Sequence, residues 1–278
     1  MKKKPEFCCR TVSPFLKWAG GKRWLTKYSN EIFPDKNTYQ RYFEPFLGSG
    51  AVFFHLMPRK AFLSDVNDEL IRTYNIVKNY PKEIEKQLKI HQEKHSFEHY
   101  YKVRDNIPKS EVGKAARFIY LNRACWNGLY RVNNKGMFNV PKGTKDKIIL
   151  DTDCFDMVAS LLKSAIIESG GFEKILSKAK KDDFVFVDPP YTVTHNKNGF
   201  IKYNERLFSW DDQVRLCGCV KEAVDRGAKV LVTNAAHEEI RKLYKDVGEI
   251  RTLSRSSILA ASSDRRGKYE EFVIKCGY

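Results

Sequence analysis

No stretch of this sequence stays apolar for the roughly 18 residues that a membrane-spanning helix requires. The chain also starts without the apolar core of a signal peptide, because three lysines between Met1 and Pro5 lead directly into Glu6 and two cysteines. Both absences predict a cytoplasmic protein that is neither exported nor held in a membrane.

Metal-binding and disulfide patterns are also lacking. The seven cysteines are an odd number, with neither CxxC spacing nor a zinc-type grouping with histidine, which predicts reduced thiols, no disulfide and no structural metal. His91, His95 and His99 are spaced by four residues on one face of a predicted helix. Since no carboxylate completes a ligand set, the spacing favours a packed or solvated helix face over a metal site. The cysteines stand at positions 8, 9, 125, 154, 217, 219 and 276.

Acidic residues are the scarcer charge, with 34 Asp and Glu against 50 Lys and Arg, a formal net charge of +16. An excess of this size favours a polyanionic partner, because clustered cations attract phosphate whatever its sequence. The excess is densest in residues 122–147, where Asp146 is the only acidic residue. Asparagine, glycine and aromatic residues fill the rest of that segment, a composition typical of a polar loop or hairpin. Its basic residues are Arg123, Arg131, Lys135, Lys142, Lys145 and Lys147.

The order of predicted elements indicates an α/β fold interrupted by a helical module. A strand at 41–44, a helix to about 57 and a strand at 60–64 form a βαβ unit, and residues 69–121 are helical with breaks at Pro81 and Pro108. Strands follow at 183–187, 228–233, 247–257 and 271–276, with a helix at 210–226. We therefore predict one α/β domain from residues 1–68 and 156–278, with a mostly helical domain at 69–155 inserted between them.

A glycine-rich turn follows the first predicted strand, at Phe46–Gly50 (FLGSG), and Asp65 ends the next strand, 15 residues after Gly50. In doubly wound sheets, ligands bind beyond the carboxyl ends of the strands, and a carboxylate in this place suits ribose hydroxyls. A tight strand–helix turn with a capping aspartate explains the same residues equally well. The turn lacks the Lys-Ser/Thr ending of a P-loop, which disfavours a nucleoside triphosphate.

The Asp188–Tyr191 segment (DPPY) ends the buried strand at 183–187 and is more specific. Two prolines keep the backbone extended and remove two donors, which leaves a carboxylate and carbonyl oxygens as an edge that only accepts hydrogen bonds. Such an edge suits a planar amino group, and Tyr191 offers a flat face for stacking a base. Fixed acceptors would favour the pyramidal, nucleophilic form of an exocyclic amine. An ordinary turn after a strand is the alternative.

These motifs, taken together and in order, resemble the Dam family of adenine-specific (N6) DNA methyltransferases of the D12 class. The resemblance implies a Rossmann-like S-adenosylmethionine-dependent methyltransferase fold with an inserted target-recognition domain that carries a β-hairpin. It covers nearly the whole chain and rests on Phe15–Lys22 (FLKWAGGK), Phe43–Gly50 (FEPFLGSG), Ser64–Asn67 (SDVN), Asn127–Arg131 (NGLYR), Phe138–Pro141 (FNVP) and Asp188–Tyr191 (DPPY).

The resemblance implies two sets of residues around the reaction. Asp188, Pro189, Pro190 and Tyr191 would hold the flipped adenine, with Asp188 also near the methyl donor. One departure concerns the donor's adenine: Gly171 stands where relatives often carry aspartate, which leaves Phe172 to stack there. The implied donor-binding residues are Trp18, Lys22, Glu44, Phe46, Gly48, Gly50, Asp65, Phe172 and Asp188.

For DNA, the resemblance implies the palindrome GATC. Lys17 and Arg131 would contact guanine, whose two major-groove acceptors suit an arginine fork, and Leu129 and Pro141 would contact a thymine methyl. Trp126 would intercalate when adenine leaves the stack, or pack at the base of the hairpin. The remaining implied DNA contacts are Asn127 in the recognition motif and Arg123, Asn133 and Asn139 at phosphates.

The predicted function is methyl transfer from S-adenosylmethionine to the N6 amino group of a flipped adenine in double-stranded DNA. Methylation of RNA adenine or of cytosine N4 is one alternative, since the DPPY edge fits any planar amine. A catalytically silent DNA-binding protein that keeps the fold is another. One flipped base per event requires only a monomer, and the resemblance admits a cognate restriction enzyme as a partner in the same system.

Overall fold

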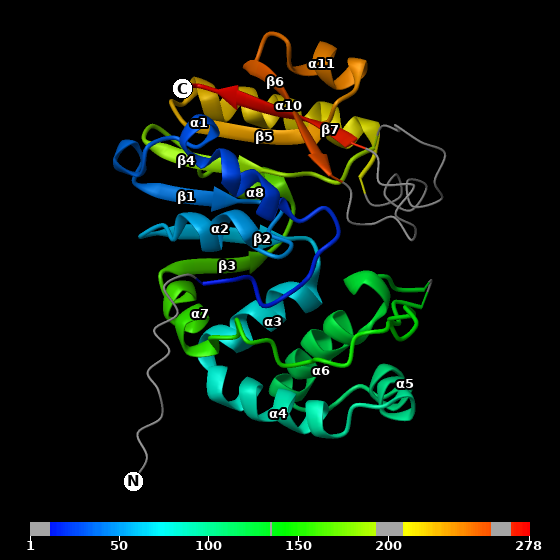
Figure 1. Ribbon diagram of the computed structural model, residues 1–278. Helices are drawn as coiled ribbons and strands as arrows, with labels where there is room; N and C mark the ends of the chain where they lie inside the picture. Colours follow the sequence, from blue (N-terminus) through cyan, green and yellow to red (C-terminus); the bar gives the residue numbers. More distant parts are fainter. Residues whose placement is uncertain (1–11, 134, 193–207, 257–267) are drawn as a thin grey trace. The chain divides into compact units, whose positions relative to one another are not determined.

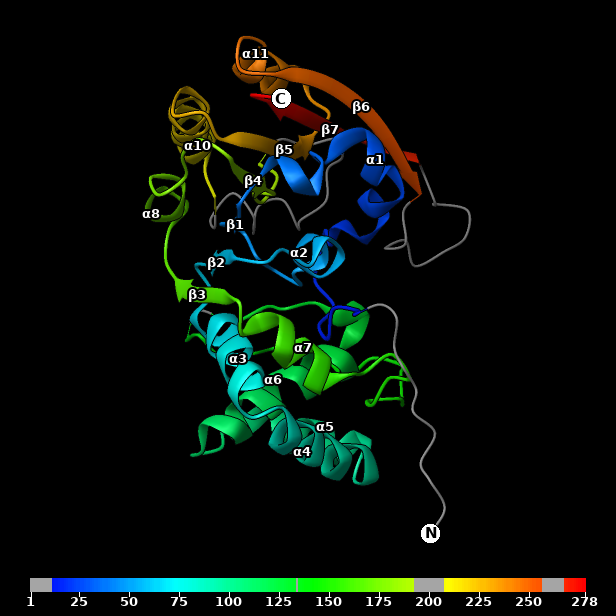
Figure 2. The same cartoon turned by 90° about the vertical axis from the view of Figure 1, so that its left-hand side faces the viewer.

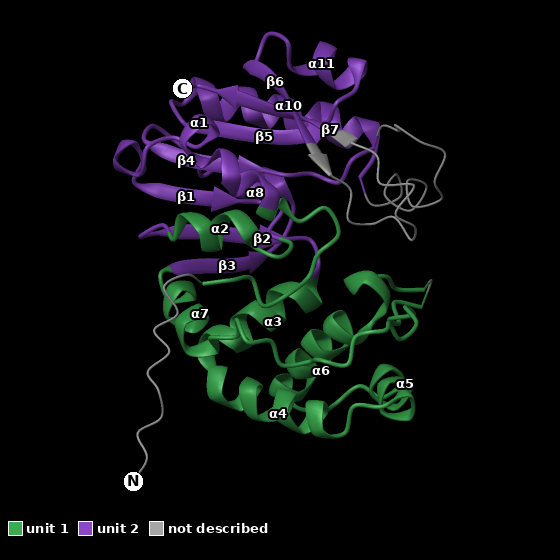
Figure 3. Ribbon diagram, viewed as in Figure 1, with its two compact units in different colours: residues 1–23, 48–57, 68–164 green, residues 24–47, 58–67, 165–278 purple. Residues whose placement is uncertain are grey.

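The computed structural model describes residues 12–133, 135–192, 208–256 and 268–278 (Figure 1). The chain divides into two compact units, shown in green and purple in Figure 3. Unit 1 comprises residues 1–23, 48–57 and 68–164, and unit 2 comprises residues 24–47, 58–67 and 165–278. Over the described ranges, no helix combines the length and the apolar character needed to cross a bilayer.

Unit 2 contains one seven-stranded sheet in the order β3-β2-β1-β4-β5-β7-β6. The pairs among β1 to β5 are parallel, whereas β7 is antiparallel to both β5 and β6. The strands are β1 (Arg41–Glu44), β2 (Ala61–Asp65), β3 (Ala165–Ser169), β4 (Asp183–Val187), β5 (Lys229–Ala235), β6 (Glu249–Ser256) and β7 (Lys268–Cys276). This sheet confirms the predicted α/β class and all six predicted strands, whereas β3 has no counterpart in the sequence prediction.

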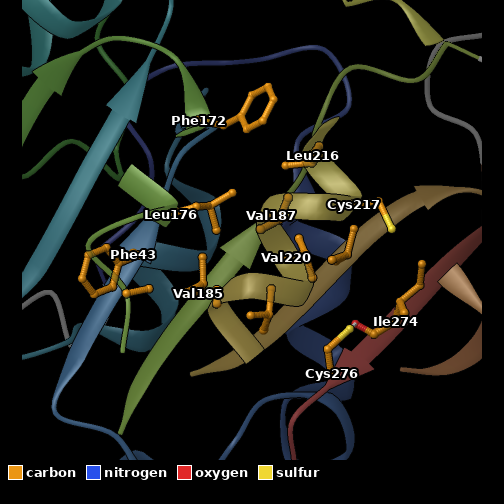
Figure 4. Packing of buried hydrophobic residues seen from close by; sticks show 14 of the residues in the cluster. Phe43, Phe172, Leu176, Val185, Val187, Leu216, Cys217, Val220, Ile274 and Cys276 are labelled. Atoms are coloured by element: carbon orange, nitrogen blue, oxygen red, sulfur yellow. Dashed lines mark hydrogen bonds between the residues drawn. The ribbon is translucent and has the colours of Figure 1, made fainter. Parts of the chain in front are cut away.

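Alternate residues of β4 pack on opposite faces of the sheet, because side chains along a strand point to alternating sides. Val185 and Val187 join the core cluster with Leu216 and Val220 of α10 (Trp210–Asp225) (Figure 4). Phe184 and Phe186 form edge-on ring contacts with Phe33 on the other face. In Figure 2, α8 (Phe172–Leu176) and α10 lie on one side of the sheet and α1 (Ser29–Ile32) on the other. The remaining helices of unit 2 are η1 (Lys22–Tyr28, mostly in this unit), η2 (Lys36–Thr38) and α11 (Glu238–Tyr244).

Unit 1 is helical, and the predicted breaks at Pro81 and Pro108 both fall where one helix ends and the next begins. Pro81 occupies the first turn of its helix, where its missing N–H costs no hydrogen bond. Pro108 precedes a helix that Ser110 caps by accepting from the Gly113 N–H. The helices are α2 (Ala51–Leu56), α3 (Asp68–Asn79), α4 (Pro81–Glu93), α5 (Phe97–Asp105), α6 (Glu111–Ala124), η3 (Trp126–Gly128) and α7 (Phe155–Leu162).

The amino-terminal segment packs within unit 1 through rings and backbone. The Phe15 ring meets the Tyr74 ring of α3 at a centroid distance of 4.9 Å, and Asn122 of α6 bonds the backbone of Lys17 at both N and O. Long-range contacts of this kind place residues 1–23 with the helices of residues 68–164. The division of roles between a catalytic and a recognition domain remains a prediction.

The predicted hairpin is reduced to two isolated antiparallel bridges, Cys125 to Lys142 and Val132 to Phe138, within the described part of unit 1. The Asn133 N–H donates to the Met137 carbonyl, and the Asn139 N–H donates to the Arg131 carbonyl. The described residues 131–133 and 135–139 therefore lie side by side as a hairpin-like loop without a regular ladder.

The three spaced histidines do not share one helix, so that prediction was wrong. Ser96 caps α5 by accepting from the His99 N–H, which places His91 on α4 and His99 on α5. His91 Nδ1 lies 3.1 Å from His99 Nε2, and His95 Nδ1 lies 2.8 Å from the Tyr120 hydroxyl. Within the described ranges, no three His, Cys, Asp or Glu side chains gather in a way that could hold a metal ion.

This histidine cluster predicts a loss of stability in acid. Burial, followed by His99 and Lys94, lowers the pKa of His91 to about 4, so the folded chain keeps it neutral while the unfolded chain takes up a proton below about pH 6.5. The free energy of unfolding should fall by about 2 kcal/mol between pH 6.5 and 4, after allowance for partial exposure. Urea denaturation across this range should show a smaller fall for His91→Gln, and equal falls in both proteins would contradict the assignment.

The described cysteines are free thiols in mixed surroundings: Cys125, Cys217 and Cys276 are buried, and Cys154 and Cys219 are partly exposed. Burial raises the pKa of Cys125 to about 12, which makes its thiol a poor nucleophile. Cys8 and Cys9 lie outside the described residues.

Candidate functional site

The sheet of unit 2 has its switch point between β1 and β4. From β1 the chain proceeds outward to β2, and from β4 it proceeds outward the other way to β5. Ligands of such sheets bind beyond the carboxyl ends of the strands at this point. Glu44 ends β1, and Asp188 follows β4 directly. The two most informative motifs of the sequence therefore meet at this edge of the sheet.

Asp188 is held by a neighbouring strand. Its Oδ1 accepts a hydrogen bond of 2.7 Å from the Thr233 hydroxyl of β5, and Thr233 is fully buried. The register explains the pairing, because Val187 lies opposite Val232 and the next residue of each strand carries the polar group. The carboxylate itself is half-buried, so it is oriented by the core and still reaches the surface.

The rest of the DPPY segment is bonded to buried polar groups that sequence reasoning missed. The Tyr191 hydroxyl donates to Glu271 Oε2 of β7 over 2.7 Å, and Glu271 is 2% exposed. The Pro190 carbonyl accepts from Gln213 Nε2 of α10 over 3.2 Å. Thr233 and Asn234 follow the apolar run of β5, and Glu271 directly precedes the apolar run of β7, so polar residues bordering these runs are the signal that could have identified them.

The end of β1 is also closely packed. Glu44 is 2% exposed and accepts from the Tyr42 hydroxyl over 2.8 Å. The Phe46 ring stacks on Phe172 at 5.8 Å, and the Phe208 ring packs against both. Phe172 is 4% exposed and belongs to the core. The expectation that Phe172 offers a face to a ligand is therefore corrected: its ring is used in packing α8 against the sheet.

Asp65 ends β2 with a half-buried carboxylate, as the sequence predicted. Its Oδ1 accepts from the Asn67 N–H over 3.0 Å, an Asx-type turn that fixes the side chain at the strand end. Val66, between the two, is 71% exposed. A carboxylate beside an exposed aliphatic side chain combines a hydroxyl acceptor with an apolar surface, and sequence reasoning passed over Val66.

Four of the predicted donor-binding residues belong to unit 1. Gly48 adopts a φ of +47°, and a Cβ there would lie 2.8 Å from Cδ1 of Trp18, so the turn and the indole both require glycine. Trp18 stacks on Tyr130 at 5.6 Å. Lys22 is 3% exposed, and its ammonium donates to the Gly20 carbonyl. Gly50, with a φ of +63°, caps α2.

The predicted DNA-contacting residues in the hairpin-like loop and on either side of it are exposed to different degrees. Trp126 is 47% exposed, which favours availability over packing at the base of the loop. The Arg131 guanidinium is exposed and donates to Asn139 at Oδ1 over 2.9 Å and at its carbonyl. Asn133 Oδ1 accepts from the Lys135 and Met137 N–H groups. Asn127 and Pro141 are exposed, and Leu129 is half-buried.

The prediction that Arg123 contacts a phosphate is wrong. Its guanidinium is 1% exposed and forms a two-pronged ion pair with Asp153, at 2.6 and 2.7 Å. The remaining donors bond the carbonyls of Phe15 and Ile148. Every donor direction is thus used inside unit 1, and the residue ties three chain segments together.

The charged form of Lys17 is disfavoured by its surroundings. Burial, then Lys145 and Arg123, lowers the pKa of Lys17 to about 8. The backbone at this position is fixed by Asn122, and a Cβ on Gly128 would lie 2.8 Å from Cβ of Lys17, so the lysine sits tightly beside the recognition motif. An anionic or electron-rich partner would relieve this charge crowding.

Comparisons with known proteins agree with these features. The family described as D12 class N6 adenine-specific DNA methyltransferase matches residues 18–258. The chain is 39% identical to the type II methyltransferase M1.LlaDCHI of Lactococcus lactis subsp. cremoris, over 95% of each chain. It is 35% identical to the type II methyltransferase M.MjaIII of Methanocaldococcus jannaschii, over 95% of this chain and 98% of that one. With the DNA adenine methylase of Escherichia coli (strain K12), identity is 31% over 83% and 84% of the two chains.

Proposed function

Because this chain belongs to the D12 class of N6 adenine-specific DNA methyltransferases, we propose that it acts on adenine flipped out of duplex DNA within GATC, with S-adenosylmethionine as donor. The family match supports the enzyme class, and the sheet order fits a methyltransferase fold. The observation that best supports the proposed reaction is the position of Asp188 at the end of β4. The target sequence, the flipping step and the roles of individual residues are the parts that this proposal adds.

The amino nitrogen of adenine is a weak nucleophile, because its lone pair is delocalised into the ring. Asp188, fixed at Oδ1 by Thr233, and the proline carbonyls that follow it offer acceptors in a set direction. Accepting both amino hydrogens favours a pyramidal nitrogen, which is the geometry of the transition state rather than of the ground state. Tyr191 supplies the stacking face that an unpaired base needs outside the duplex.

The residues at the ends of β1 and β2 fit the donor. The Asp65 carboxylate suits the two ribose hydroxyls, and exposed Val66 beside it suits the flat face of the donor's adenine. Glu44 adds a buried carboxylate at the switch point. When bound, S-adenosylmethionine supplies a methyl group activated by its positive sulfur. Donor binding by four residues of unit 1 is a prediction that rests on the resemblance alone; these residues are Trp18, Lys22, Gly48 and Gly50.

We propose that the hairpin-like loop and the residues on either side of it recognise the target sequence. Asn139 holds the Arg131 guanidinium in one orientation, as a fork for guanine's major-groove acceptors requires. Exposed Pro141 and half-buried Leu129 offer apolar contacts for a thymine methyl. Trp126 has enough exposed indole to enter the space that a flipped base leaves.

The direct test follows transfer of labelled methyl from S-adenosylmethionine to two short duplexes, one with GATC and one with that site scrambled. Label on adenine of the GATC duplex alone supports the proposed reaction and target sequence. Label on both duplexes would overturn the assigned sequence and keep the reaction, whereas label on structured RNA but on neither duplex would overturn the substrate.

Lys17 gives a pH prediction for binding. If its ammonium must be charged to contact DNA, affinity for the GATC duplex should weaken about fivefold from pH 8 to pH 9, because with a pKa of about 8 the protonated fraction of Lys17 falls from about one half to about one tenth. Lys17→Arg should remove this dependence, because arginine stays charged. Fluorescence anisotropy at fixed ionic strength measures both. Lys27→Arg, at an exposed lysine, is the matched control, and an unchanged pH dependence in Lys17→Arg would contradict the role.

A further inference from the structure

The DPPY segment, which would hold the target base, is connected by hydrogen bonds to four buried polar side chains. Thr233, Asn234 and Gln213 are fully buried, and Glu271 is 2% exposed. Polar groups are costly to bury unless they are hydrogen-bonded, so their accumulation in one place calls for a reason. All four connect, directly or through one another, to the DPPY segment.

Two adjacent strands and one helix supply these groups. Thr233 of β5 donates to Asp188 Oδ1, and Tyr191 donates to Glu271 of β7, each over 2.7 Å. Gln213 of α10 donates to the Pro190 carbonyl while its own Oε1 accepts from Asn234 over 3.0 Å. The register brings them together, because Ala235 of β5 lies opposite Glu271 of β7, just past Thr233 and Asn234.

We propose that Thr233 and Glu271 are positioning residues for methyl transfer, with Thr233 setting the plane of the Asp188 carboxylate and Glu271 setting the tilt of the Tyr191 ring. This inference rests on the proposed function. A carboxylate fixed at one oxygen presents its acceptors in one direction, and a phenol fixed at its hydroxyl keeps its ring face ready for a base. Neither residue needs to touch the substrate.

The two roles separate in kinetics. Thr233 acts on the acceptor of the amino group, so its loss should lower kcat and leave KM for DNA nearly unchanged. Glu271 acts on the stacking face, so its loss should weaken capture of the flipped base, raise KM for DNA and lower kcat less. A hydrogen bond to a charged group corresponds to roughly a 10- to 100-fold change in rate.

The experiment compares Thr233→Val, which has the same shape without the hydroxyl, with Thr233→Ser, which keeps it. We expect kcat to fall about 10- to 100-fold in the valine protein and to stay within about threefold of wild type in the serine protein. Wild-type protein with no transfer to any DNA would overturn the proposed function, and the inference with it. Active wild type with equal kcat in the valine and serine proteins would overturn the inference alone.

Glu271 provides an independent comparison that holds even if Thr233→Val does not fold. Glu271→Met removes the acceptor, and Glu271→Gln keeps one. With 2-aminopurine at the target position of the duplex, the fluorescence change on binding reports the unstacked base and its stacking on Tyr191. A change in amplitude for Glu271→Met but not for Glu271→Gln, at equal melting temperatures, supports the positioning role. The wild-type amplitude in both proteins would overturn it.

Discussion

Asp188→Ala is expected to lower kcat for adenine methylation by about 100- to 1,000-fold, the size seen when one preorganised electrostatic contact to a transition state is removed. The carboxylate, held by Thr233 at the end of β4, is the acceptor that we propose favours a pyramidal amino nitrogen. Duplex binding should change less than threefold, because phosphate contacts supply most of the affinity for DNA and an aspartate carries the wrong charge to make one. Single-turnover transfer of labelled methyl, with fluorescence anisotropy for binding, separates the two quantities.

Asp188→Asn sharpens the comparison. An amide keeps one acceptor oxygen for the base but carries no negative charge, and the Thr233 hydroxyl can turn to accept from its NH2 group, so kcat should lie between those of wild type and Asp188→Ala. Asp225→Ala, at an exposed aspartate near the end of α10, controls for loss of a carboxylate. A near-normal rate in Asp188→Ala would rule out this account of catalysis.

The strands around this site were predictable because they are short, apolar and followed at once by the motif residues. Continuous runs such as DFVFV can be buried only between two covered faces, which fixes both the element and its place in a parallel sheet. β3 (AIIES) escaped prediction because five residues with two exposed positions give too weak a pattern. The supporting residues Thr233 and Glu271 escaped as well, since only the register of β4, β5 and β7 brings them to the site.

The errors share one physical cause, which is that a sequence shows charge and spacing but not burial. His91 and His99 have helical spacing, yet Ser96 caps a new helix between them and turns a helix face into a contact between two helices. Arg123 counts as one more cation in a basic segment, although all of the last ten residues of α6 are buried. A helix apolar on all sides lies inside the protein, and a cation on it needs a partner there.

Arg123→Met should therefore lower the free energy of unfolding by about 3–5 kcal/mol, the usual cost of breaking a buried ion pair at one partner. The substitution would remove the Arg123 donors from the Asp153 carboxylate and from the carbonyls of Phe15 and Ile148, and the carboxylate would keep the Leu150 N–H as a donor. Urea denaturation measures the loss. In the folded fraction, the slope of log affinity against log salt should stay unchanged, since no phosphate contact is removed.

Arg131→Met is the matched comparison, because Arg131 is exposed on the hairpin-like loop and Arg123 is not. It should change stability by less than about 0.5 kcal/mol, as surface substitutions do, and lower affinity for the GATC duplex about tenfold or more through loss of a guanine contact. The two substitutions should therefore have opposite effects: Arg123→Met lowers the free energy of unfolding, and Arg131→Met lowers the affinity for DNA. Unchanged stability in Arg123→Met, together with a salt slope smaller by about 0.9, would instead place Arg123 at a phosphate.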